Sequence, residues 1–247
     1  MFKNFFQNKY IDFAPIIVLV ILGALFYIIS GSASFQIFTN FLSNNNFASP
    51  SSTLFTSANK NIFNLEYRYL VVVFLAVIVI KLGYKIYIKT NNKKNYKKYS
   101  ELINLYVNSF SYAIFIIILS VLAGLQDIST IIMVGVSSFI GVRFLLNDSV
   151  NDENSVQKRW NGITLSVLSW ILLIIYSIGT LIFGQVRSTW YVYVLDFLCL
   201  MYFVFIATSA RKKLFRIISK RKSFSIFETV NFIFIVLSLL ILAVGLK

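Results

Sequence analysis

Residues 69–122 read YLVVVFLAVIVIKLGYKIYIKTNNKKNYKKYSELINLYVNSFSYAIFIIILSVL. Two apolar runs of about 20 residues flank a lysine-rich gap, and about 20 helical residues are needed to cross a hydrocarbon core of about 30 Å. Helices in the core of a soluble protein would be shorter and would carry a polar face. The stretch therefore predicts two membrane-spanning helices joined by a short basic loop.

The same pattern recurs along the 247-residue chain, in which 58% of the residues are hydrophobic. We predict seven spans, at about residues 13–30, 69–88, 102–122, 128–146, 163–183, 190–209 and 226–246. Because these spans take up nearly the whole sequence, no soluble catalytic domain fits beside them. The sequence thus predicts an all-α, multi-pass integral membrane protein with a single domain, residues 1–247, built as a seven-helix transmembrane bundle.

Basic residues gather on one side of the predicted bundle. Of the 23 lysines and arginines, 19 lie on one side, in alternate gaps between the apolar runs or near the ends of the runs that border them; seven of these are in residues 81–98 and seven in 211–222. The four on the opposite side are Lys60, Arg68, Arg187 and Lys247. Short basic loops stay in the cytoplasm, so we expect a cytoplasmic N terminus, an external C terminus and contacts with anionic inner-leaflet lipids. The net charge of +14 would permit a nucleic-acid patch, but the charges lie at helix ends, which disfavours nucleic acid as a partner.

The residue content argues against an enzyme. The chain has no histidine, which removes the usual proton shuttle and metal ligand at neutral pH, and its nine acidic residues are scattered. We expect no catalytic residues and no metal site. The single cysteine, Cys199, lies inside a predicted span and is expected to be a small core residue.

Residues 31–64 form the long first external loop. They are rich in Ser, Asn and Thr, and apolar residues alternate with polar ones around Phe35 and Ile37. This alternation suits a short hairpin packed on the mouths of the helices, and a flexible Ser/Asn loop is the open alternative.

Several acidic residues have a structural explanation as helix caps. Ser225 and Glu228 have the spacing of a capping box at the start of the last span. Asp127 stands where the N-cap of the fourth span is expected, and Asn64 with Glu66 does so for the second span.

Capping does not explain Asp196 or Lys81. Asp196 lies about two turns inside the sixth span, roughly 10 Å below the outer surface, where a charge is costly and often marks a proton or substrate path. Helical spacing puts Tyr193 and Cys199 on its face, and Tyr176 of the fifth span could reach it. A hydrogen-bonded Asp196 that ties two helices together through a tyrosine hydroxyl is the equally weighted alternative. Lys81 lies near the cytoplasmic end of its span and is expected to snorkel outward.

The topology and several short motifs resemble the heliorhodopsins. The matching segments are 65–66, 123–128, 135–138, 169–176 around Trp170, and 228 with 235–239. This resemblance implies a rhodopsin-like bundle with inverted topology and a homodimer.

The chain departs from the family at the chromophore site. The retinal-binding lysine of the family falls at Leu239 or Leu242 here, and no lysine lies between Lys222 and Lys247. The family's counterion glutamate falls near Val107 or Asn108, and its pocket histidines have no counterpart. A Schiff base needs a primary amine at the pocket, so we expect no covalent cofactor, although noncovalent retinoid or lipid could occupy the old pocket.

Three hypotheses for the function follow. The first is a heliorhodopsin-like protein without covalent retinal that binds, scaffolds or signals, with Asp196, Tyr193, Tyr176 and Trp170 as its candidate functional polar residues. The alternative is a small proton/cation or solute transporter or channel that uses Asp196, although the sequence shows no internal repeat of the transporter kind. A purely structural membrane protein is the third.

Overall fold

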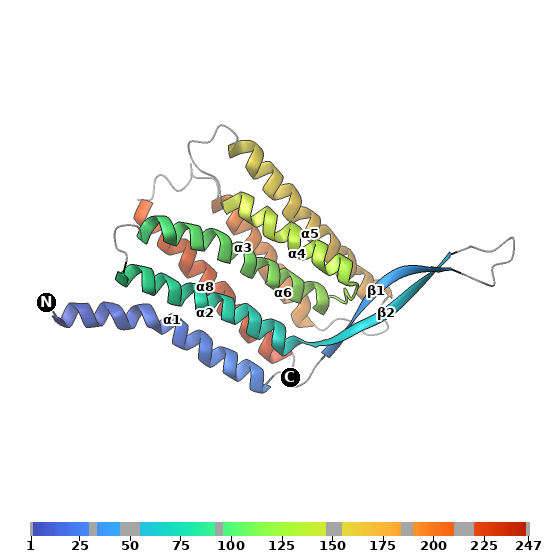
Figure 1. The fold of residues 1–247 in the computed structure, drawn as a ribbon, viewed down its shortest axis with the longest axis horizontal. Coiled ribbons are helices and arrows are strands. Elements are labelled where there is room, and N and C mark those ends of the chain that lie inside the picture. Colours follow the sequence, from blue (N-terminus) through green and yellow to red (C-terminus); the bar gives the residue numbers. More distant parts are fainter. Residues whose placement is uncertain are drawn as a thin grey trace.

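Seven helices and one two-stranded sheet make up the described part of the chain. The computed structural model describes residues 2–29, 34–44, 55–91, 96–146, 155–183, 190–209 and 220–245. The elements are α1 (Phe2–Ile29), β1 (Ser34–Asn44), β2 (Phe55–Glu66), α2 (Tyr67–Asn91), α3 (Tyr96–Leu122), α4 (Ile128–Leu146), α5 (Ser155–Phe183), α6 (Trp190–Ser209) and α8 (Lys220–Gly245) (Figure 1). Each predicted apolar run lies in one helix, and the ends expected to be external agree to within two residues. At the other end most helices run further than predicted, because hydropathy marks only the part of a helix that lies in hydrocarbon.

Five helices are long and apolar enough to cross a membrane. Their apolar segments are Tyr67–Ile88, Leu102–Leu122, Ile128–Leu146, Gln157–Ile182 and Trp190–Thr208, and shorter ones, Phe13–Ile29 and Val230–Gly245, lie in α1 and α8. Large apolar side chains cover the outside of the bundle, where Ile28, Ile80 and Phe197 are 76%, 69% and 65% exposed. Lipid chains solvate such a surface, whereas water does not. The helices therefore indicate an integral, multi-pass membrane protein.

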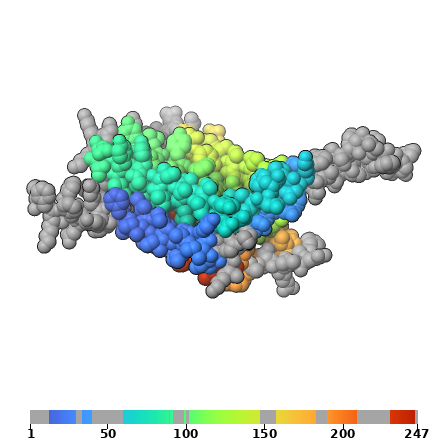
Figure 2. Space-filling view, turned by 60° about the horizontal axis from the view of Figure 1, so that its bottom comes forward, coloured from blue at the N-terminus to red at the C-terminus, as the bar shows by residue number. Residues whose placement is uncertain are grey.

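The central helix of the bundle is α3. It packs against α2, α4, α5 and α6, and 67% of its apolar segment is buried. α1 packs on α2 and α8, and α8 packs on α6, so the first and last helices are neighbours. Figure 2 shows α1 and α2 side by side along one face of the molecule. The interior is one large apolar cluster in which Ile118 and Leu119 of α3 are fully buried.

Small residues let α4 and α5 approach each other closely. A Cβ atom added at Gly141 would lie 2.8 Å from the backbone nitrogen of Ser166 and 2.9 Å from the carbonyl oxygen of Gly162. Beside this contact, the Ser137 and Ser169 hydroxyls share a hydrogen bond of 2.6 Å. Close backbone packing with interhelical hydroxyl bonds is a usual source of helix association in lipid, where the hydrophobic effect does not drive it.

The segment between α1 and α2, which we expected to be an external loop, contains an antiparallel hairpin, which confirms the hairpin hypothesis and extends it to longer strands. The strands β1 and β2 pair from Ser34 opposite Glu66, with a bulge at Ile37 and Phe38. The base of the hairpin packs on the turn between α3 and α4: Phe35 and Ile37 are buried in a small apolar cluster there, and the Phe38 amide donates to the Gln126 carbonyl at 2.9 Å. Pleated alternation turns Phe35 and Ile37 toward the same face, which is why both are buried together.

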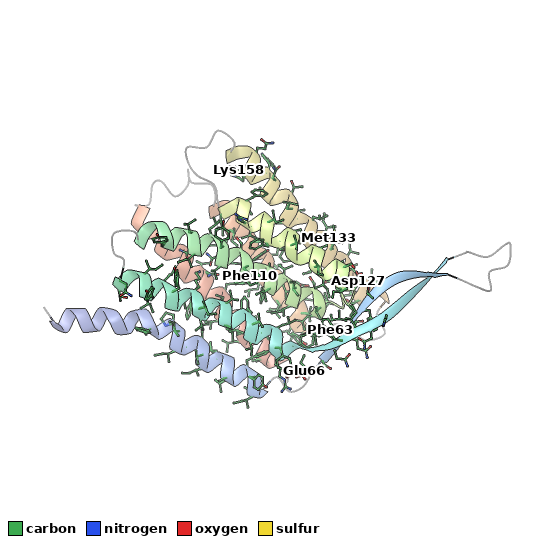
Figure 3. All side chains as sticks on the ribbon, in the orientation of Figure 1. Phe63, Glu66, Phe110, Asp127, Met133 and Lys158 are labelled. Atoms are coloured by element: carbon green, nitrogen blue, oxygen red, sulfur yellow. The ribbon has the colours of Figure 1, made fainter. Side chains whose placement is uncertain are left out.

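One of the three predicted caps is confirmed. Asp127 Oδ2 accepts hydrogen bonds from the Thr130 amide at 2.8 Å and from the Thr130 hydroxyl at 2.7 Å, as an N-cap of α4 does. Glu66 and Asp127 lie at the hairpin end of the bundle, opposite Lys158 at the start of α5 (Figure 3).

The other two predicted caps are wrong at Asn64 and at Ser225. Asn64 is a residue of strand β2 and accepts from Asn61 at 3.3 Å, while Glu66 directly precedes α2 and forms an ion pair with Arg68. α8 begins at Lys220, so its start is not at Ser225, and the capping box with Glu228 is wrong. The side chains of Ser225 and Glu228 lie outside the described part of the chain.

Candidate functional site

A buried lysine joins α2 to α3. The Lys81 ammonium donates a hydrogen bond to Asn108 Oδ1, and these side chains are only 5% and 6% exposed. Lys81 lies about 21 Å along the helix from Tyr67, at about 1.5 Å per residue. Because the ammonium is directed to α3 and is hidden from the surface, the expectation that Lys81 snorkels outward is wrong.

A second buried lysine and a second buried asparagine lie one turn further along. Lys85 and Asn104 are 8% and 7% exposed. The two helices are antiparallel neighbours, so the i+4 residue of one and the i−4 residue of the other stand at the same level. We call Lys81, Lys85, Asn104 and Asn108 the amine–amide cluster.

Sequence reasoning missed this cluster, although a signal for it was present. Lys81 and Lys85 are four residues apart, and so are Asn104 and Asn108, so each pair lies on one helix face. A short gap joins the two helices and makes them antiparallel neighbours. The depth of each pair could therefore have been matched before the structure was known.

A small void adjoins the cluster at Asn108. Its volume is about 10 Å³, about the space that one water molecule occupies. Polar groups of Asn108, Ser111, Tyr202 and Asn231 line it together with aromatic rings of α2, α3 and α8. Pockets that enclose a drug-sized ligand measure about 300 Å³ or more, so this void does not hold a retinoid.

Aromatic hydrogen bonds link four helices around the void. Trp170 of α5 donates from Nε1 to the Tyr112 hydroxyl of α3 at 3.1 Å. Tyr202 of α6 donates to Asn231 Oδ1 of α8 at 2.6 Å, and its ring stacks on Phe234 with centroids 4.1 Å apart. Trp170 thus acts here as a buried connector between helices, with 5% of its surface exposed.

The positions that match the family's lysine are packed with apolar side chains. Leu239 and Leu242 of α8 are 2% and 1% exposed and belong to the same apolar cluster as Trp170. Asn108, one of the two positions that the resemblance offers for the counterion, accepts a hydrogen bond from the Lys81 amine of α2. The buried amine of this chain, Lys81, therefore lies on α2, whereas the resemblance places the family's lysine on the last helix.

Asp196 ties α5 to α6. It accepts a hydrogen bond from the Ser177 hydroxyl at 3.1 Å, so the expected tie between helices is made by a serine in place of a tyrosine. Its second oxygen, Oδ1, and the Tyr193 hydroxyl are both buried and find no hydrogen-bond partner within the described ranges. Tyr176, directly before Ser177, packs instead against the apolar cluster under the hairpin, so the structure does not bring it to Asp196. Cys199, one turn from Asp196, is fully buried.

Neither metal ligands nor known relatives add to this site. The side chains that the structure describes contain no group of three or more Cys, Asp or Glu residues placed to hold a metal ion. No model of a protein family matches the chain, and no curated protein is significantly similar to it.

Proposed function

We propose that this chain is a heliorhodopsin-like membrane protein that acts without covalent retinal, as a seven-helix protein for binding, scaffolding or signalling. The observation that carries the proposal is the burial of Leu239 and Leu242, which fill the place of the family's lysine with apolar side chains. A Schiff base there has no amine to form from.

Two features of the fold support the heliorhodopsin-like part of the proposal. The first and last helices, α1 and α8, are neighbours, and α3 is central, as a closed seven-helix bundle requires. The long insertion between α1 and α2 is a hairpin that packs on the α3–α4 turn. Both agree with the topology that the resemblance implies.

Reconstitution with all-trans retinal tests the proposal. We expect the purified full chain to show no visible absorption band beyond that of unbound retinal. A red-shifted band that resists hydroxylamine and moves with pH would contradict the proposal. Lys81→Met is the informative variant in that case, because Lys81 is a buried primary amine and its loss would abolish a Schiff base formed on it.

The proposal also includes the orientation of the protein in the membrane and its assembly as a homodimer. The hairpin and the cap at Asp127 share one end of the bundle, and Lys158 lies at the other (Figure 3), which agrees with a basic cytoplasmic side and a cytoplasmic N terminus. A glycosylation tag placed in the hairpin should be modified, and one at the N terminus should not. The proposed homodimer predicts twice the monomer mass of 28.3 kDa in native mass spectrometry.

Asp196 supports a second candidate, a small proton, cation or solute transporter or channel. Its Oδ1 atom and the Tyr193 hydroxyl are buried polar atoms with no partner in the described part of the bundle. Such groups are costly in lipid, and they typically mark a path for protons or a substrate. Flux through proteoliposomes should then fall in Asp196→Asn. Flux that survives this substitution unchanged would remove Asp196 from the mechanism.

A further inference from the structure

We propose that the amine–amide cluster between α2 and α3 binds a small inorganic anion of the chloride class. This inference does not depend on the family resemblance or on the state of the chromophore site. It starts from a cation that is placed deep in the bundle and that is paired with a neutral group.

The charge of Lys81 has no counterion among the side chains that the structure describes. An ammonium group has three N–H donors, and Asn108 accepts from only one of them. No carboxylate among the described side chains pairs with Lys81. A buried cation without an anion is unfavourable in a low-dielectric interior, and a bound anion would reduce that penalty.

Asn104 gives a second, independent indication of a ligand. Its side chain is 7% exposed, and both its Nδ2 and Oδ1 atoms are buried without a hydrogen-bond partner in the described ranges. Buried amide donors nearly always have a partner, so an unused one marks a place where something binds. Asn104 lies one turn from Asn108 on the same face of α3, at the level of Lys85.

The burial of the site restricts the size of the ligand. The four side chains of the cluster are between 5% and 8% exposed, which leaves no opening for a lipid headgroup or a peptide carboxylate. N–H donors of the Lys81 ammonium and the Asn104 amide favour an anion over a neutral water.

Thermal unfolding of the detergent-solubilised full chain tests the site. Samples at one pH and one ionic strength contain sodium chloride or sodium gluconate, whose anion is too large for the site. At chloride tenfold above Kd, Tm should rise by about 3 to 6 °C relative to gluconate, because a ligand that binds only the folded state stabilises it. Equal Tm values in the two salts would overturn the proposal.

Two variants and one control locate the effect. Lys81→Met should abolish the chloride-dependent rise in Tm, and Asn104→Leu should reduce the chloride affinity by about tenfold or more. Lys60→Met makes the same substitution at an exposed residue of β2 and should keep the full effect. A full chloride effect in Lys81→Met would also overturn the proposal.

Direct binding covers the case in which a variant does not fold. The ³⁵Cl NMR signal should be broader in the presence of the wild-type protein and should narrow when bromide competes. This measurement detects binding without any unfolding step. A parallel sample receives phosphatidylglycerol in place of chloride. If only the lipid raises Tm, the occupant is a lipid headgroup and the inorganic anion is excluded.

Discussion

Lys81 on α2 and Asn108 on α3 are hydrogen-bonded to each other at a depth where each is less than a tenth exposed. The contact is asymmetric, because one partner carries a charge and the other does not. Loss of the amide leaves a buried charge with fewer partners, whereas loss of the amine removes the charge itself.

This asymmetry predicts a difference between two substitutions. Asn108→Leu should lower the free energy of unfolding by about 2 to 3 kcal/mol, because the Lys81 ammonium loses its acceptor. Lys81→Met keeps the length of the side chain and should be neutral or stabilising. Tm values measured in gluconate buffer, where the proposed anion does not contribute, check both.

The double variant Lys81→Met with Asn108→Leu provides the control. It should be more stable than Asn108→Leu alone, since the charge is gone. If the loss of stability in the double variant equals the sum of the losses in the two single variants, a direct contact between the two side chains is contradicted.

Close packing of α4 on α5 predicts that Gly141 tolerates no larger side chain. Gly141→Leu should cost about 3 kcal/mol or more, because even a Cβ atom would meet backbone atoms of α5 at 2.8 to 2.9 Å. The measurement is Tm, with size-exclusion chromatography to follow assembly. Gly83→Ala is the matched control: nothing lies within 4 Å of an added Cβ there, so it should raise Tm slightly through helix propensity.

The sequence allowed good prediction of helix positions, and the reason is physical. A hydrocarbon core demands about 20 apolar residues with their backbone hydrogen bonds satisfied inside the helix, so hydropathy alone marks each segment. The same rule ends where the hydrocarbon ends. The predicted starts of α1, α5 and α8 therefore lie later in the sequence than the observed starts, and the cap predicted at Ser225 is wrong.

Side-chain partners were harder to predict, because they depend on how helices rotate about their axes. Lys81 could snorkel outward or turn inward by a small rotation of α2, and its sequence position is the same in both cases. For Asp196 the depth was foreseen, but its partner proved to be Ser177 instead of the neighbouring Tyr176. One residue along a helix corresponds to a rotation of about 100°, which redirects the side chain to another neighbour.

Attachment of the hairpin to the bundle predicts a contrast between two phenylalanines. Phe35 is 7% exposed against the α3–α4 turn, whereas Phe63 on the paired strand is 43% exposed. Phe35→Ala should cost about 3 kcal/mol, and Phe63→Ala less than about 0.5 kcal/mol. Proteolysis of the hairpin should accelerate only in Phe35→Ala, and equal rates in the two variants would show that the hairpin is held by other contacts.

Because the cap at Asp127 consists of two hydrogen bonds, loss of the acceptor oxygen should destabilise the protein more than loss of the charge. Asp127→Ala should lower the free energy of unfolding by about 1 to 2 kcal/mol, since the Thr130 amide and hydroxyl both lose their acceptor. Asp127→Asn keeps an acceptor oxygen of the same reach and should lose less than half as much, mainly through the helix dipole. Thr130→Val removes only the hydrogen bond that the Thr130 hydroxyl donates, and its Tm should lie between those of Asp127→Asn and Asp127→Ala. Equal losses in Asp127→Asn and Asp127→Ala would mean that Asp127 stabilises α4 by its charge alone, because only the charge is missing from both variants.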